Sequence, residues 1–354
     1  MEIQDLLLMT QKMGASDLHI TVGIPPVLRI HGELKRLDVP PLMPADTEKL
    51  VYSLFDEDTL KQRFEEYGEV DFAYGRPNLG RYRVNAYRQR GTCALALRNV
   101  ATKVPTMESL GLPSAILQKL AKNTRGLVLV TGPTGSGKST TLATMIDYIN
   151  QTRRCHILTL EDPIEYLHKH NKSIVNQREI GIDTKNYGVA LKAALREDPD
   201  VILVGEMRDT ETIATAITAA ETGHLVLSTL HTLGASQTID RIIDVFPPDQ
   251  QDQIRIQLAT LLQGVMSQQL LTNRDAKGRS VAYEIMLTTS AISNLIREGK
   301  SYQINSHIQT SGKLGMQTMD MSLMKLYQQG KITLEQMLNH AFVPGEIKRM
   351  LNLP

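Results

Sequence analysis

The octapeptide Gly132-Pro-Thr-Gly-Ser-Gly-Lys-Ser139 limits what this chain can fold into more than any other feature. It matches the G-x-x-x-x-G-K-[ST] pattern of phosphate-binding loops, it follows the apolar run 127–130, and it precedes a helical pattern at 140–149. A strand, a glycine-rich turn and a helix in this order place backbone N–H groups and a helix N-terminus around phosphate oxygens. We therefore expect a nucleotide-binding α/β domain, and a glycine-rich turn that arose by chance is the alternative.

The chemistry of this motif predicts a role for its polar residues. Lys138 is expected to reach the β and γ oxygens of ATP, and Ser139 is expected to ligate Mg²⁺. The residues that we expect to bind the nucleotide are Gly132, Pro133, Thr134, Gly135, Ser136, Gly137, Lys138, Ser139 and Thr140.

Two groups of carboxylates follow other apolar runs, and hydrolysis of ATP needs such a group to orient water. Glu161 follows the run 157–160, and Glu206 stands one residue beyond the run 201–204, where Gly205 occupies the position that is usually acidic. We predict that Glu206 orients water and that Glu161 is a second candidate for water or Mg²⁺. Asp162 and Glu165 have an equal structural interpretation, for example as caps of the turn at Pro163. For both Glu206 and Glu161, the alternative is a carboxylate that is merely exposed to solvent at the end of a strand.

Histidines and arginines supply further candidates. His224 and His231 bracket the predicted strand 225–230, and His231 lies at its carboxyl end, where it is a candidate sensor of the γ-phosphate. A structural role is equally compatible with His224. Several arginines cluster near the end of the first hundred residues, where an arginine finger and a solvated β surface are both open interpretations.

The order of apolar runs predicts two domains joined by a linker. Residues 1–100 combine one amphipathic helix with strand-like segments at 27–30, 70–74 and 81–88, which is typical of a small α+β domain. Residues 101–112 lack periodicity and are the predicted linker. In 113–354, buried parallel strands are expected at 127–130, 157–160, 201–204 and 225–227. Helical periodicity at 254–265, 321–327 and 332–337 predicts a helical C-terminal tail.

Composition excludes several classes of function. The 39 Lys and Arg nearly balance 38 Asp and Glu in 354 residues, so no global charge attracts nucleic acid or an anionic bilayer. The two cysteines, Cys93 and Cys155, provide neither a disulfide framework nor a zinc ribbon. We expect no signal peptide and no direct membrane insertion. The methionines Met316, Met319, Met321 and Met324 are either core residues or a partner surface.

Five motifs together resemble the PilT-type retraction ATPases of type IV pili, within the secretion ATPase superfamily, and the resemblance covers essentially the whole chain. Ala291-Ile-Ser-Asn-Leu-Ile-Arg-Glu298 also looks like a PilT motif, but Ser293 stands where Arg is usual. The five motifs are Ala15-Ser-Asp-Leu-His19, the phosphate loop, Glu161-Asp-Pro-Ile-Glu165, Asp198 to Asp209, and Thr222-Gly-His224 to His231-Thr232.

The resemblance implies a PAS-like N-terminal domain, a RecA-like P-loop ATPase domain and a homohexamer. Arginines matching Arg83 and Arg98 are then candidates to reach the phosphates, and the hinge lies in the linker. It further implies a cytoplasmic motor, peripheral at the inner face of the membrane, that hydrolyses ATP and turns an inner-membrane platform protein to retract pili in twitching motility. An accessory or assembly ATPase of the superfamily, a scaffold with little turnover and a P-loop kinase are the alternatives.

Overall fold

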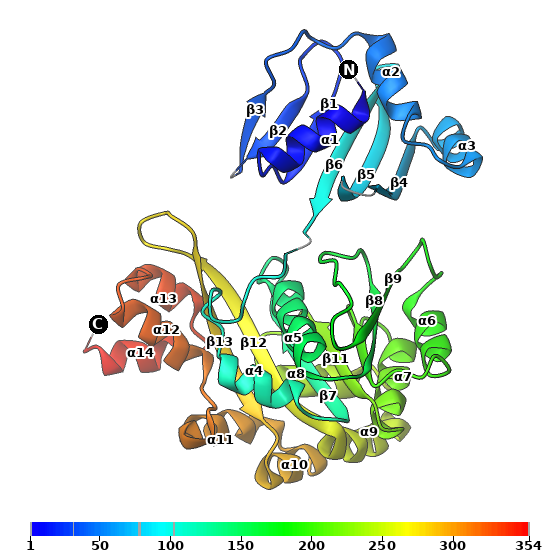
Figure 1. The fold of residues 1–354 in the computed structure, drawn as a ribbon. Coiled ribbons are helices and arrows are strands. Elements are labelled where there is room, and N and C mark those ends of the chain that lie inside the picture. The colour runs from blue at the N-terminus through cyan, green and yellow to red at the C-terminus, as the bar shows by residue number, and fades with distance from the viewer. Residues whose placement is uncertain (1, 31, 77–78, 102, 353–354) are drawn as a thin grey trace. The chain divides into compact units, whose positions relative to one another are not determined.

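The computed structural model describes residues 2–30, 32–76, 79–101 and 103–352. The chain forms two compact units, residues 1–103 and residues 104–354 (Figure 1). Between β6 and the first helix of the second unit, residues 104–113 contain turns and no helix or strand. Thr102, in the predicted linker 101–112, lies outside the described residues.

The first unit is built on an antiparallel sheet with the strand order β3-β2-β1-β6-β5-β4. Tyr82 is fully buried in its core, and its hydroxyl donates to the carbonyl of Leu7 at 3.1 Å. The α+β prediction is confirmed, and all three predicted strand segments lie in strands. The strands are β1 (Asp17–Ile20), β2 (Val27–Ile30), β3 (Glu33–Arg36), β4 (Glu69–Arg76), β5 (Gly80–Gln89) and β6 (Thr92–Val100).

The prediction of one helix in this unit is wrong, because its described residues form three: α1 (Ile3–Lys12), α2 (Pro44–Tyr52) and α3 (Asp58–Tyr67). The third helix buries a single residue, Phe64. Its apolar side chains, Leu60, Phe64 and Tyr67, are few among charged neighbours, and so short a pattern is too weak to predict a helix from sequence.

The second unit is built on a mixed sheet with the order β13-β12-β7-β11-β10-β8-β9. Its central strands β7, β11, β10 and β8 are parallel and buried on both faces, which confirms the predicted α/β class and the four predicted strands. The strands are β7 (Gly126–Thr131), β8 (His156–Glu161), β9 (Ile174–Glu179), β10 (Val201–Val204), β11 (Leu225–Leu230), β12 (Leu262–Thr272) and β13 (Arg279–Leu287).

Helices cover both faces of this sheet (Figure 1). The connection through α5 crosses the sheet in one direction, and the connections through α6, α7 and α9 cross it in the other. Because such crossovers are right-handed, α5 lies on one face of the sheet and α6, α7 and α9 lie on the opposite face. Helix α4 packs on α5, and α8 packs on α9. These helices are α4 (Ser114–Ala121), α5 (Lys138–Thr152), α6 (Tyr187–Ala194), α7 (Thr210–Glu221), α8 (Ala235–Asp244) and α9 (Pro248–Leu261).

The helical prediction at 254–265 is wrong beyond residue 261, where α9 ends and β12 begins. Leu262 and Val265 belong to β12, which is parallel to β7 and antiparallel to β13. Because β12 is buried on both faces, its sequence lacks the alternation that marks a strand exposed on one side. The helical C-terminal part starts at α10 (Ser290–Arg297) and continues through α11 (Ile304–Thr310), α12 (Met319–Gln328), α13 (Leu334–His340) and α14 (Pro344–Met350).

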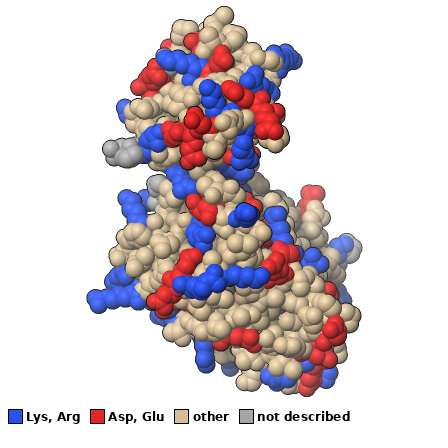
Figure 2. Space-filling view, turned by 90° about the vertical axis from the view of Figure 1, so that its right-hand side faces the viewer, with Lys and Arg blue, Asp and Glu red and all other residues tan. Residues whose placement is uncertain are grey.

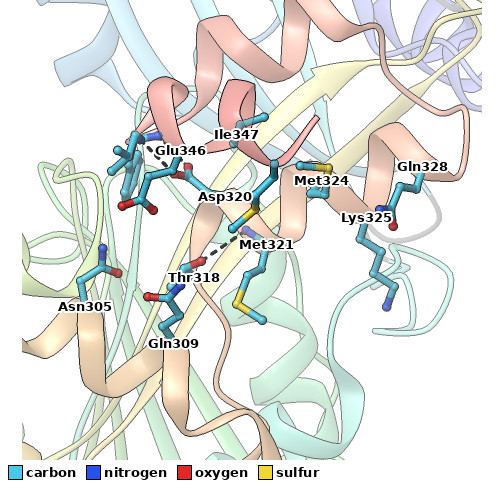
Figure 3. A pocket seen from close by; sticks show the side chains of 13 residues that line it. Asn305, Gln309, Thr318, Asp320, Met321, Met324, Lys325, Gln328, Glu346 and Ile347 are labelled. Atoms are coloured by element: carbon cyan, nitrogen blue, oxygen red, sulfur yellow. Dashed lines mark hydrogen bonds between the residues drawn. The ribbon is translucent and has the colours of Figure 1, made fainter. Parts of the chain in front are cut away.

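The methionines of the C-terminal part divide between core and surface. Met316 and Met319 are buried. Met321 and Met324 line a hollow of about 260 Å³ beside Ile347 of α14 (Figure 3). The core interpretation therefore holds for Met316 and Met319, and in part for Met324, which packs against the C-terminal core, whereas Met321 is exposed.

The surface shows mixed charge on the face that Figure 2 displays, where basic and acidic side chains alternate among wide uncharged areas. None of the helices in the described ranges is long and apolar enough to cross a membrane.

Candidate functional site

The phosphate loop connects the buried strand β7 to α5, and its conformation depends on glycine. Gly132, Gly135 and Gly137 have φ values of +141°, +78° and +89°, which L side chains rarely adopt. A Cβ atom at Gly132 would lie 2.1 Å from the carbonyl oxygen of Gln268, which is a backbone atom of the paired strand β12. The loop is therefore shaped both by its own glycines and by the neighbouring strand β12.

Lys138, the first residue of α5, is buried against the loop. Its Nζ donates to the carbonyls of Gly132 at 2.9 Å and Pro133 at 3.2 Å. Burial lowers the pKa of this ammonium, while the negative charges of Glu206 and Glu165 partly oppose the shift. The ammonium is thus held by the loop in a position from which it can turn to phosphate oxygens.

Glu161 ends β8 and lies in the cleft beside the loop. Its Oε1 accepts hydrogen bonds from Thr159 Oγ1 at 2.6 Å and from Gln177 Nε2 at 3.1 Å. Desolvation outweighs these bonds and raises the pKa of the carboxyl above its usual value, and the charge of Glu165 acts in the same direction. A cation near Glu161 would favour the ionised form.

Glu206 lies at the carboxyl end of β10, and its side chain is only 18% exposed. Its Oε1 accepts from Arg208 Nε at 2.8 Å and from His231 Nε2 at 3.1 Å. Burial opposes its charge, but the bond from Arg208 and the proximity of His231 outweigh burial and hold its pKa below the usual value. Glu206 is therefore ionised at neutral pH.

His231 links this carboxylate to the phosphate loop. While its Nε2 contacts Glu206, its Nδ1 lies 3.3 Å from Thr134 Oγ1. It directly follows β11, whose carboxyl end shares an edge with β7 and β10. The structure thus brings three of the predicted residues into one connected group.

The cleft beside the loop has a volume of about 320 Å³ and contains oxygen donors suited to Mg²⁺. Ser139, Glu161 and Glu206 all line it. Within the described ranges, no group of three or more His, Cys, Asp or Glu side chains could hold a metal by itself. Mg²⁺ is usually bound by one or two protein ligands together with waters and substrate phosphates.

A second hollow also borders the loop. It is lined by residues 135–141 of the loop and the start of α5, and by apolar side chains of the segment before α4 and of the β12–β13 pair. Leu110, Leu112 and Val281 form its apolar walls, and Arg279 adds a positive charge. The buried hydroxyl of Ser136 has no hydrogen-bond partner among the residues that the structure describes. The loop is thus bordered by a polar cleft and by an apolar hollow, and the two together suit a nucleotide.

Arg83 and Arg98 belong to the first unit, where they are exposed and directly opposite each other on β5 and β6. The Nε atom of Arg98 forms an ion pair with Asp17 Oδ1 at 2.9 Å. His224 lies away from the cleft, and its Nδ1 lies 2.8 Å from the carbonyl of Ala219 and 3.1 Å from Thr222 Oγ1. These bonds favour the structural interpretation of His224.

Several residues at the site were not predicted. Arg208 binds Glu206 from two positions further along the chain, but a loop sequence does not reveal where its side chains point. Tyr166 OH lies 3.1 Å from Thr140 Oγ1. Gln268 reaches the loop across more than a hundred residues of sequence. Sequence spacing provides no signal for such a distant contact.

Known proteins match this chain over most of its length. The family model "Type II/IV secretion system protein" matches residues 88–339. The type IV pilus retraction ATPase PilT of Pseudomonas aeruginosa is 50% identical over 344 residues, which are 97% of this chain and 99% of the relative. The type IV pilus ATPase PilU of the same species is 43% identical over 353 residues, covering 100% of this chain and 92% of the relative.

A solved structure matches nearly the whole molecule. The crystal structure of the pilus retraction motor PilT with bound ADP has 53% sequence identity and a TM-score of 0.91, and the match covers 99% of this chain and 100% of that one. Identity to PilT thus exceeds identity to PilU over comparable lengths. The chain belongs to the type II/IV secretion ATPase family and, within it, to the PilT-type pilus retraction ATPases.

Proposed function

We propose that the chain binds ATP with Mg²⁺ at the phosphate loop and hydrolyses it with Glu206 as the residue that orients water. One observation carries this proposal: the ionised Glu206 lines the same cleft as Lys138 and is joined to the loop through His231. A carboxylate in this position has the charge and the reach to accept a proton from a water molecule.

The neighbouring side chains supply the remaining roles. Lys138 exchanges the carbonyls of Gly132 and Pro133 for β and γ oxygens, and Ser139 is the protein ligand that α5 offers to Mg²⁺. When bound, Mg²⁺ neutralises charge that develops on the phosphates. His231 lies between Thr134 and Glu206 and so can report the γ-phosphate to the carboxylate. Glu161 is the second carboxylate for water or Mg²⁺.

The apolar hollow beside the loop is the proposed place of the adenine base. Leu110, Leu112 and Val281 offer a surface on which a planar base can pack, and Arg279 can contact the ribose or the α-phosphate. The bound ADP of the matched PilT structure supports nucleotide binding by a chain of this fold.

We propose that the working form is a homohexamer in which Arg83 and Arg98 reach the phosphates. Both guanidinium groups are exposed on one face of the first unit. An arginine that approaches the γ-phosphate offsets negative charge in the transition state. The proposed domains are residues 1–100 and 113–354, with the hinge at 101–112.

The proposed output is retraction of type IV pili, as in twitching motility. The motor acts on an inner-membrane platform protein from the cytoplasmic side, peripheral to the membrane, and binds no nucleic acid. The names of the matched PilT proteins support this direction of work. Ser293 lies on α10, and a Ser293→Arg variant tests whether that position alters retraction without altering turnover.

Steady-state ATPase activity of the purified protein, measured together with its oligomeric mass, tests the proposal. We expect Mg²⁺-dependent turnover by a hexamer. Binding of ATP without turnover would instead support a nucleotide-dependent scaffold. Turnover with no pilus retraction in cells would support an accessory ATPase.

A further inference from the structure

Strand β12 continues past the end of β7 and lies against the phosphate loop. The register pairs Met266 with Val130 and Ser267 with Thr131, the last residue of β7. The next residue, Gln268, therefore lies beside Gly132, where the loop begins. Its side chain is 1% exposed. A fully buried amide at this position needs polar partners, and both of its partners belong to the loop and α5.

The amide of Gln268 forms two hydrogen bonds. Its Nε2 donates to the carbonyl of Ser136 at 2.6 Å, and its Oε1 accepts from the hydroxyl of Thr141 at 2.8 Å. A carbonyl only accepts, and the hydroxyl of Thr141 supplies the complementary donor, so the amide has one satisfactory orientation. One side chain thus connects the last peptide of the loop to the first turn of α5.

The bond to Ser136 has a consequence for the next N–H group. In a planar trans peptide the C=O and the following N–H point in opposite directions. Because the carbonyl of Ser136 points to Gln268, the N–H of Gly137 points away from β12. Gly137 is the N-cap of α5, and N–H groups at this position of a phosphate loop are the ones that bind phosphate oxygens.

We propose that Gln268 is a positioning residue for nucleotide binding: it fixes the Ser136–Gly137 peptide so that the Gly137 N–H faces the phosphates. The inference rests on the proposed function of the loop and adds a residue that acts on the phosphates through the Ser136–Gly137 peptide, although Gln268 also borders the apolar hollow beside the loop. It predicts that loss of the Gln268 amide weakens ADP and ATP alike, because the loop binds phosphates that both nucleotides carry.

The adjacent residue provides a matched control. Gln269 is 5% exposed, and its amide also forms two hydrogen bonds, donating to the carbonyl of His340 at 3.2 Å and contacting His340 Nδ1 at 2.7 Å. Successive strand residues point to opposite faces, so Gln269 faces α13 and not the loop. Gln268→Met and Gln269→Met therefore remove equivalent buried amides with similar expected losses of stability.

The experiment measures ADP affinity by calorimetry, and the thermal midpoint without nucleotide, for wild type and both variants. We expect Gln268→Met to raise the Kd of ADP by about ten- to a hundredfold, as for loss of a hydrogen bond to a charged group. Gln269→Met should stay within about twofold while its midpoint falls similarly. An unchanged Kd in Gln268→Met, or equal losses in both variants, would overturn the proposal. Failure of the wild type to bind ADP would overturn the nucleotide site itself.

Thr141→Val tests the same inference independently and remains available if Gln268→Met does not fold. It removes the hydroxyl that orients the amide but keeps the shape of the side chain, and we expect a weaker loss of ADP affinity. If Gln268→Met folds, combining the two changes should cause no further loss, because both changes release the same peptide. Wild-type affinity in Thr141→Val, or additive losses in the double variant, would contradict it.

Discussion

Replacing Glu206 by Gln tests the proposed hydrolytic role with the smallest change in shape. The substitution removes the negative charge but leaves an oxygen that can accept from Arg208 or His231, both of which bind Oε1. A neutral amide has little ability to accept a proton from water. We therefore expect the chemical step to suffer while the cleft keeps its form.

The magnitude follows from the position of the side chain. Loss of a general base costs about 10²- to 10⁴-fold in rate, or about 3–5 kcal/mol in the activation free energy. The partner Arg208 is 71% exposed, so the lost ion pair contributes at most about 1 kcal/mol to stability. For a domain of this size that corresponds to about 2–4 °C in the thermal midpoint.

The assay combines steady-state turnover, ATP affinity and the thermal midpoint. We expect kcat to fall at least about a hundredfold, with ATP affinity retained. Glu211→Gln is the control, because Glu211 forms an exposed ion pair with Lys192 at 2.6 Å and lines no part of the cleft. Turnover of Glu206→Gln close to wild type, or an equal loss in the control, would refute the role of Glu206.

Four other outcomes are expected. Lys138→Ala should abolish binding of both ATP and ADP in calorimetry, and retained ADP binding would remove Lys138 from the phosphate site. Gly132→Ala should destabilise the chain more than Gly135→Ala, because a Cβ at position 132 would lie 2.1 Å from a backbone oxygen. A Cβ at position 135 has open space, so that substitution adds only about 1–2 kcal/mol of backbone strain. Equal thermal midpoints of the two variants would contradict this. The pKa of Glu206 is lowered in the folded state from 4.5, so its interactions stabilise the fold above about pH 4.5 and this contribution is lost as the pH falls through the lowered pKa. The difference in free energy of unfolding between wild type and Glu206→Gln should therefore stay constant from pH 8 to about 5 and shrink below that range, and a difference that grows at low pH would contradict this. Arg83→Ala and Arg98→Ala should lower turnover while ADP binding and hexamer mass persist, and undiminished turnover in both would exclude the finger role.

Residues close in sequence to a clear pattern could be predicted. The loop motif and four buried apolar runs were sufficient to place β7, β8, β10 and β11. Parallel strands share their carboxyl edge, so the spacing also indicated that Glu161, Glu206 and His231 lie near the loop. The lining of one cleft by all three follows from that topology.

The contacts that complete the site depend on packing and could not be predicted. Leu262 and Val265 continued a helical pattern, yet β12 pairs with β7 and is buried on both faces. The apolar periodicity of a short segment does not separate a buried strand from a buried helix. Without β12 in its place, nothing relates Gln268 to the loop.

The residues proposed to act in hydrolysis and the residue proposed to orient the loop therefore come from different parts of the sheet. The residues proposed to act on water, Glu206 and Glu161, and the proposed sensor His231 come from strand ends, where the topology of parallel strands gathers them whatever their separation in sequence. Gln268, the residue proposed to orient the loop, lies on the neighbouring strand β12. The register between β12 and β7 determines which residue of β12 lies beside the loop. Shifting that pairing by one residue would turn the amide of Gln268 to the opposite face, toward α13, and would bring either Gln269 or Ser267 beside Gly132, depending on the direction of the shift. In the present register the carbonyl oxygen of Gln268 also lies close to Gly132, where a side chain would collide with it. The glycine at the start of the loop and the register of β12 therefore depend on each other.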